Sequence, residues 1–305
     1  MNTLILINGA ANNGTGLKKW KQIRESFFQM IRSENVDEII YHPPYNFIEN
    51  KGGQSYQRIF FGGGDGSFHH GLNAWLNFQK RNTDEVQFGA IGLGSSNDLH
   101  KPFGTVIDKI PIRIYPVPYK QDVGRVVIIE NEQELTKYFV INASLGITAY
   151  GNYLFNHPDP ILRFTKSRWT NFAINYAALK SILLYKNIMV EVDSGEGYKP
   201  MKLSTVNIIK SVHIAGGLFF DQDIKPNDGF LGVNTCENMN KLELMHVFAD
   251  LSKGKFLGKP KRDSQVAKAI RFRSASIIPL ELDGEIYFGN EFIFDLLPQH
   301  INLLR

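Results

Sequence analysis

The sequence is poor in cysteine and lacks long apolar runs. Cys236 is the only cysteine in 305 residues, which excludes a disulfide within the chain and a zinc site built from several thiolates. A single thiol suits a reducing compartment. No window reaches the roughly 18 consecutive apolar residues of a membrane-spanning helix, and the first residues lack the regions of a signal peptide. We therefore expect a cytoplasmic protein whose contact with a membrane is peripheral.

A large excess of charge of either sign is also lacking. The 34 basic and 30 acidic residues leave a formal net charge of +4, which is too small to indicate a nucleic-acid partner. Hydrophobic residues make up 43% of the chain, an ordinary share for a protein with a sizeable core. The length favours two domains.

The first third of the chain alternates strand patterns with helix patterns. The apolar runs that predict strands lie at residues 4–8, 36–41, 58–61 and 87–91. Apolar residues at helical spacing follow the first and third of these runs. This alternation predicts a three-layer α/β domain with a mostly parallel sheet. Glycine-rich segments at 62–67 and 92–98 follow two of the strands, at the sheet edge where such folds bind ligands.

The pattern of apolar residues changes after about residue 111, where strand patterns dominate. They lie at residues 112–116, 125–130, 138–142, 188–193, 203–209, 230–234 and 277–282. Such a series predicts a β-sandwich or a similar β-rich domain. One helical stretch, at about 160–186, interrupts it. The first domain is expected at residues 1–120 and the second at 121–291.

The glycine segments fit no common nucleotide motif. Gly9–Gly14 has the spacing of a Walker loop, but Thr15 stands where that loop needs a lysine. The dinucleotide fingerprint and the nucleophile elbow also fail. Gly62–Ser67 nevertheless lies between a strand and a helix pattern, where backbone N–H groups can reach a phosphate. Taken alone, its Asp-Gly pair is more often a tight turn.

Five short segments, in order along the chain, resemble motifs of one family. They are Asn8–Gly16, Gly63–Ser67, Gly94–Leu99, Gly216–Gly217 with Asn227–Gly229, and Leu282–Glu285. Together they resemble the diacylglycerol kinase catalytic domain family, which includes bacterial lipid kinases and the sphingosine and ceramide kinases. The resemblance implies a NAD kinase/diacylglycerol kinase-like first domain, to which residues 292–305 return, and a β-sandwich second domain that takes the lipid.

The resemblance also implies an ATP- and Mg²⁺-dependent lipid kinase. The residues that it places around the ATP phosphates and the nucleotide are Gly63, Gly64, Asp65, Gly66, Ser67, Gly94, Ser95, Asn97 and Asp98. Asp283 stands where the family has its general base, and Glu285 lies beside it, near the nucleotide. Asp65 and Glu285 are candidates for holding the magnesium that accompanies ATP. Without the other motifs, Asp283-Gly284 is simply a hairpin turn.

Bacterial members also hold a structural magnesium at an Asp-Gly turn. Here that implies the side chain of Asp228 and the backbone carbonyls of Lys225 and Phe230. The chain departs from the family at His69-His70, where the family has Asn-Glu, which leaves the acceptor open. A NAD kinase and a non-catalytic lipid- or nucleotide-binding relative are the alternatives. The oligomeric state also stays open, with a homodimer among the options.

Two basic stretches bear on membrane contact. Residues 161–186 hold five basic residues and no acidic one, among apolar residues. This pattern fits a helix resting on an anionic bilayer, or equally a helix packed on the second domain with a solvated basic edge. Residues 253–273 hold eight basic residues against Asp263 alone. We expect a mobile loop there, with contact to lipid headgroups as the alternative.

Overall fold

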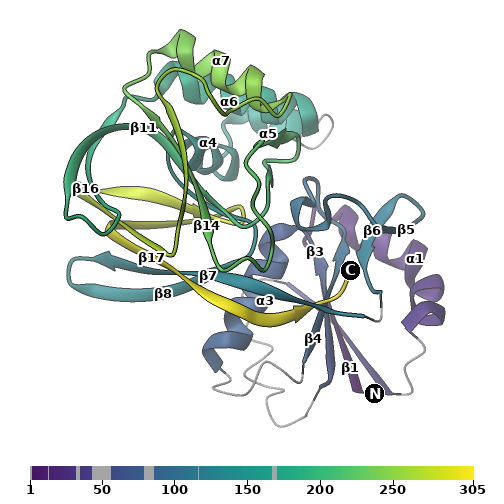
Figure 1. Cartoon of the computed structure of the whole chain (residues 1–305). Helices are drawn as coiled ribbons and strands as arrows, with labels where there is room; N and C mark the ends of the chain where they lie inside the picture. Colours follow the sequence, from purple (N-terminus) through teal and green to yellow (C-terminus); the bar gives the residue numbers. More distant parts are fainter. Residues whose placement is uncertain are drawn as a thin grey trace. The chain divides into compact units, whose positions relative to one another are not determined.

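The structure is a computed structural model that describes residues 2–12, 14–31, 35–42, 56–78, 86–115, 117–166 and 170–305. The chain divides into two compact units, whose elements are labelled in Figure 1. Unit 1 comprises Met1–Asp122 and Pro298–Arg305, and unit 2 comprises Val123–Leu297.

Unit 1 contains a sheet of parallel strands with a short antiparallel extension. Its parallel strands are β1 (Asn2–Asn8), β2 (Asn35–Tyr41), β3 (Arg58–Gly63), β4 (Gln87–Gly92) and the last residues of β17 (Glu285–Leu303). They lie in the order β17-β4-β3-β1-β2. The extension consists of β6 (Ile110–Arg113), antiparallel to β4, and β5 (Thr105–Ile107). All the expected strands of the first third are therefore present. Pro116, in the strand predicted at 112–116, lies outside the described residues.

Two helices pack on opposite faces of this sheet. They are α1 (Thr15–Ile31) and α3 (Asp65–Phe78). The buried stripe of α1 includes Trp20 and Phe27, and the Phe27 ring meets Phe60 of β3 edge-on at 5.0 Å. Phe68 of α3 packs edge-on against the next strand residue, Phe61, at 5.4 Å. Because neighbouring residues of a strand point to opposite faces, the two helices cover different sides.

Unit 2 is β-rich, as the sequence predicts. Its strands are β7 (Tyr119–Glu130), which begins in unit 1, β8 (Gln133–Phe139), β9 (Asn142–Gly146), β10 (Ile188–Asp193), β11 (Lys199–Ile209), β14 (Leu231–Glu237), β15 (Arg262–Ala267), β16 (Ala269–Leu282) and most of β17, with a small pair β12 (His213–Ile214) and β13 (Leu218–Phe219). The main path runs β15-β14-β11-β10-β16-β17, and β9 pairs with both β11 and β16. Alternate residues of these strands form one large apolar core.

Four helices gather on one side of unit 2 (Figure 1). They are α4 (Ile147–Asn156), α5 (Pro160–Lys166), α6 (Thr170–Leu184) and α7 (Lys241–Leu251). The helical stretch expected at 160–186 is confirmed as α5 and α6. Helix α7 was not among the predicted elements, although Asn240 and Glu243 form a capping box at its start. A small apolar cluster links α5 to α6 through Leu162, Ala173 and Ala177.

Two expectations for unit 2 are wrong. The predicted strand at 138–142 straddles the end of β8 and the start of β9, because Val140 and Ile141 lie between the two strands. The stretch 253–273 is not a loop throughout, since it contains β15 and the first residues of β16, both paired in the sheet. Arg262 of this stretch forms an ion pair with Asp250 of α7 at 2.8 Å. Part of the basic charge of residues 253–273 is therefore paired within unit 2.

Candidate active site

Three segments follow parallel strands of unit 1 at the same edge of the sheet. The strands β1, β3 and β4 end at Asn8, Gly63 and Gly92, and parallel strands have their carboxyl ends together. The Asn8 side-chain amide donates to the hydroxyl oxygen of Ser67 at 2.9 Å, and its Oδ1 accepts the N–H of Ala10 at 3.0 Å. The opening segment and the first glycine segment are thereby joined. Asn13, in the opening motif, lies outside the described residues.

Asp65 joins the first glycine segment to the second. Its two carboxylate oxygens accept the backbone N–H groups of Asp98 and Leu99, each at 3.0 Å. The carbonyl of Gly63 accepts the N–H groups of Leu93 at 2.8 Å and Gly94 at 3.0 Å. All nine residues expected around the nucleotide in unit 1 therefore lie in two segments held against one another.

The close approach of these two segments requires glycine. A Cβ atom added to Gly94 would lie 2.5 Å from the Cα of Gly64. Backbone thus faces backbone beside the start of α3 at Asp65. The first N–H groups of a helix lack acceptors within the helix and carry partial positive charge, which suits an anion. This geometry fits a phosphate chain.

The second segment holds a polar atom that fits a ligand. Asn97 adopts a left-handed conformation with φ of 52°, and its amide donates to the carbonyls of Gly92 at 3.3 Å and Gly94 at 3.4 Å. Asn97 Oδ1 is buried and accepts no hydrogen bond from the described residues. A nucleotide N–H or O–H would satisfy it. Asp98, in contrast, is buried and pairs with Lys101 at 2.6 Å, and the Ser95 side chain is exposed.

Lys19 brings a basic group to the same place. Its Nζ donates to the carbonyl of Gly94 at 3.4 Å, and burial lowers the pKa of this lysine. Lys19 was not among the predicted site residues, because it lies on α1 outside every motif. A lysine beside the glycine segments could have been inferred only from the packing of α1 on the sheet.

In unit 2, Asp283 and Gly284 form the two-residue turn between β16 and β17. Leu282 pairs with Glu285 across the turn, and the turn residues have φ of 47° and 96°. Two positive φ values are typical of the hairpin turn that matches strand twist. The prediction that Asp283 and Gly284 form a hairpin turn is therefore confirmed. Glu285, at the start of β17, is partly exposed.

The Asp283 carboxylate points inward and is 3% exposed. Its oxygens accept the backbone N–H groups of Val140 at 3.1 Å, Ile141 at 2.9 Å and Asn142 at 3.1 Å. The turn acid therefore fixes the connection between β8 and β9. These bonds set the direction of its carboxylate within unit 2.

Glu281, which the sequence analysis missed, is a second buried carboxyl group beside Asp283. It is 3% exposed, and its Oε2 accepts from the Asn142 side chain at 2.7 Å and from Ser144 Oγ at 2.6 Å. Its Oε1 accepts the N–H of Gly284 at 2.7 Å. Burial raises the pKa of Glu281 to about 7; the hydrogen bonds oppose this rise, and the nearby Asp283 charge adds to it. An acidic residue inside an apolar strand, two positions before Asp283, was the available signal.

The three groups that the resemblance assigns to a structural magnesium do lie together. The carbonyl of Lys225, Oδ1 of Asp228 and the carbonyl of Phe230 all accept hydrogen bonds from Lys210 Nζ, at 2.8, 2.8 and 2.7 Å. A magnesium ion does not fit here, because it would need the same oxygen lone pairs at 2.0–2.1 Å, where the ammonium nitrogen already lies. Within the described part of the chain, no cluster of three or more His, Cys, Asp or Glu side chains could hold a metal.

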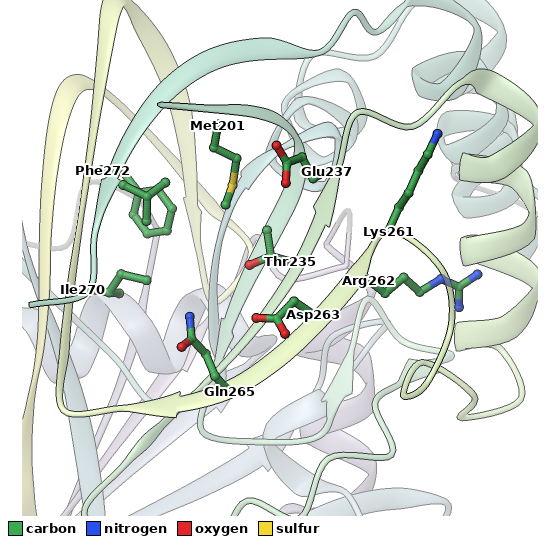
Figure 2. A pocket seen from close by; sticks show the side chains of 10 residues that line it. Met201, Thr235, Glu237, Lys261, Arg262, Asp263, Gln265, Ile270 and Phe272 are labelled. Carbon is green, nitrogen blue, oxygen red and sulfur yellow. The ribbon is translucent and has the colours of Figure 1, made fainter. Parts of the chain in front are cut away.

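A pocket of about 200 Å³ opens in unit 2 between strands β10, β11, β14, β15 and β16. Figure 2 shows Ile270 and Phe272 on one side of it and Lys261 and Arg262 on the other. None of the expected site residues lines this pocket. Its volume is below the roughly 300–1,000 Å³ of common ligand pockets, so we assign no substrate to it.

Comparison with known proteins agrees with the motifs. Residues 2–111 match the family model of the diacylglycerol kinase catalytic domain, and residues 162–305 match that of the YegS C-terminal NAD kinase beta sandwich-like domain. The resemblance of the motifs to the diacylglycerol kinase family is thereby confirmed. At the coarse level of enzyme class, these matches support a kinase.

Three similar proteins are distant in sequence. The diacylglycerol kinase of Staphylococcus carnosus (strain TM300) is 23% identical over 258 residues, which cover 82% of this chain and 77% of that protein. The crystal structure of a diacylglycerol kinase from Bacillus anthracis strain Sterne has a TM-score of 0.63 at 14% identity, covering 99% of this chain and 96% of that one. A second structure from that organism has a TM-score of 0.67 at 18% identity, covering 99% and 94%. These structures share the fold.

The chain shows no membrane span in the part that the structure describes. None of its described helices is long and apolar enough to cross a bilayer.

Proposed function

We propose that the chain is an ATP- and Mg²⁺-dependent kinase that transfers the γ-phosphate of ATP to the hydroxyl group of a lipid. The observation that carries the proposal is the pair of hydrogen bonds from the N–H groups of Asp98 and Leu99 to the Asp65 carboxylate, which we call the Asp65 clasp. It holds the two glycine segments together at the start of α3. The relative from Staphylococcus carnosus is named a diacylglycerol kinase, which supports a lipid as acceptor.

The residues of unit 1 would bind the phosphates and the rest of the nucleotide. The N–H groups of residues 64–66 at the start of α3 would donate to phosphate oxygens, and Lys19 would add positive charge. Asn97 Oδ1 would accept from a nucleotide N–H or O–H group. A magnesium ion bound with ATP would neutralise charge on the phosphate oxygens. Asp65 and Glu285, both partly exposed carboxylates, are the residues that we propose for it.

The residues of unit 2 would accept the proton of the acceptor hydroxyl. Its oxygen forms a bond to the γ-phosphorus, the bond from that phosphorus to the bridging oxygen breaks, and ADP leaves with the electron pair. In this proposal the proton passes to the Asp283 carboxylate, whose direction is fixed by three backbone amides. Glu281 is coupled to Asp283 through Asn142, which donates to both, so its protonation state affects the proposed base.

We also propose that the helical side of unit 2 rests on an anionic bilayer. Large apolar side chains are exposed there: Ile161 at 57%, Phe164 at 53%, Phe172 at 55%, Leu183 at 54% and Leu242 at 62%. They lie on α5, α6 and α7, and those on α5 and α6 fall within residues 161–186, which contain no acidic residue. Exposed apolar groups with basic neighbours are typical of helices that lie on a membrane surface. Arg168 and Trp169 of this stretch lie outside the described residues.

The test is incubation of the purified protein with γ-labelled ATP, magnesium and vesicles that contain a panel of lipids, with NAD in parallel. Label in a lipid supports the proposal. Label in NAD supports the second candidate, a NAD kinase, which the description of the second family model favours. ATP binding without transfer to any acceptor would contradict both and leave a non-catalytic relative.

A further inference from the structure

Lys210 is a lysine whose side chain is 0% exposed. It directly follows β11, and its backbone N–H donates to the carbonyl of Ile141 at 2.8 Å. Lysine is almost never fully buried unless its charge is paired. Here the ammonium group has three donors, and three oxygen acceptors surround it.

The three acceptors come from one short turn. They are the carbonyl of Lys225, Oδ1 of Asp228 and the carbonyl of Phe230. The Asp228 carboxylate also closes the turn, because it accepts the N–H groups of Lys225 at 2.7 Å and Phe230 at 3.0 Å. Burial would raise the pKa of Asp228, but hydrogen bonds from Lys210 and from the two N–H groups keep it below its usual value. The carboxylate therefore stays an anion beside the ammonium.

This set of oxygens is of the kind that hard divalent cations prefer. Carboxylate and backbone carbonyl oxygens bind Mg²⁺ at about 2.0–2.1 Å and Ca²⁺ at about 2.3–2.6 Å. In this chain the group at their centre is the lysine nitrogen, at 2.7–2.8 Å from each oxygen. A metal ion at this centre would have to displace a buried lysine and lie beside a like charge. The turn is therefore built around one cation, and that cation belongs to the chain.

We propose that the Lys210 ammonium is a built-in cation that takes the place of a bound divalent metal at the 225–230 turn. Unit 2 then folds without metal from solution. This inference does not depend on the proposed kinase activity, because it concerns the free protein. It also predicts that removing the lysine side chain leaves a vacant oxygen site that a divalent cation can enter.

The test compares thermal unfolding of the nucleotide-free protein in EDTA and in Mg²⁺ or Ca²⁺. The wild-type midpoint should be the same in both. The midpoint of Lys210→Ala in EDTA should be lower by roughly 10 °C, because the variant leaves the partly buried Asp228 carboxylate without its cationic partner, and a divalent cation should restore part of the loss. Lys202→Ala is the matched control, since Lys202 is an exposed lysine of β11, the strand that Lys210 directly follows, and its replacement should change neither value. A Lys210→Ala midpoint no more sensitive to cations than the wild type would overturn the proposal.

A second measurement on the wild type decides the matter if Lys210→Ala fails to fold. Lysines are acetylated in EDTA and in Mg²⁺ and located by mass spectrometry. Lys210 should resist acetylation in both, whereas the side chain of Lys225, which is exposed, should react. Faster acetylation of Lys210 in Mg²⁺ would show that the metal displaces the ammonium, and the proposal would fail.

Discussion

Replacing Glu281 by glutamine should remove a pH dependence of stability from unit 2. The pKa of Glu281 is raised from 4.5 to about 7, chiefly by burial. The folded protein therefore favours the neutral carboxyl group, whereas the unfolded chain ionises near 4.5. The stabilisation is complete below about pH 4.5 and is lost as the pH rises to about 7. At about 1.4 kcal/mol for each pH unit, the loss amounts to about 3 kcal/mol.

Glutamine is neutral at every pH and has nearly the same shape, so Glu281→Gln should lack this loss. Its NH₂ group can donate to Ser144, whose hydroxyl can accept as well as donate, and the Asn142 amide can turn to suit. Carboxylates with lowered pKa, such as Glu38, are present in both proteins, so their effect cancels in the comparison.

The assay is urea unfolding of both proteins at a series of pH values. The free energy of unfolding of the wild type, relative to Glu281→Gln, should fall by about 3 kcal/mol between about pH 4.5 and values above 7. Glu130→Gln, at an exposed position, should show no such trend against the wild type. A difference between wild type and Glu281→Gln that stays constant with pH would refute the reasoning.

Three further predictions concern binding and turnover. Asp65→Asn leaves one backbone amide of the second glycine segment without its acceptor, so the Kd for ATP measured by calorimetry should rise about 10- to 100-fold. An unchanged Kd would show that the Asp65 hydrogen bonds are not needed for ATP binding. Asp283→Asn should reduce kcat at least about 100-fold with little change in the Kd for ATP, and near wild-type turnover would dismiss it as the base. The double variant Phe164→Ser/Phe172→Ser should bind anionic vesicles at least about tenfold more weakly in a sedimentation assay. The control Val266→Ser, at a residue that is 52% exposed, should bind as the wild type does. Equal binding by the wild type and both variants would contradict the proposal that the helical side of unit 2 rests on the bilayer.

Strands β1, β3 and β4 of unit 1 were predictable because they are buried on both faces and read as mostly apolar runs. In unit 2, by contrast, β17 was missed although it spans Glu285–Leu303, because Gly289 and Pro298 interrupt its pattern. Its partner β16 was partly taken for a loop because basic residues were counted there. The buried Ile270 and Phe272 alternate with exposed Arg271, which is the period of a strand. A count of charges hid that alternation.

The motifs indicated which turns and loops to examine, but not how their side chains pair. The Asn142 amide donates to Glu281 across 139 positions of sequence, and Lys210 meets Asp228 across 18. Such pairs arise only when strands from distant segments come together, and one sequence carries no pattern for them. The resemblance therefore located the Asp228 turn correctly, whereas the cation within it became evident only from the packing.

The central claim is that ATP phosphates lie against the two glycine segments that Asp65 holds together. Hydrogen exchange of the backbone amides, measured with and without ATP and magnesium, tests it most directly. The account predicts slower exchange at 63–67 and 94–99 when ATP is bound. ATP binding, verified by calorimetry, that leaves exchange in both segments unchanged would contradict it.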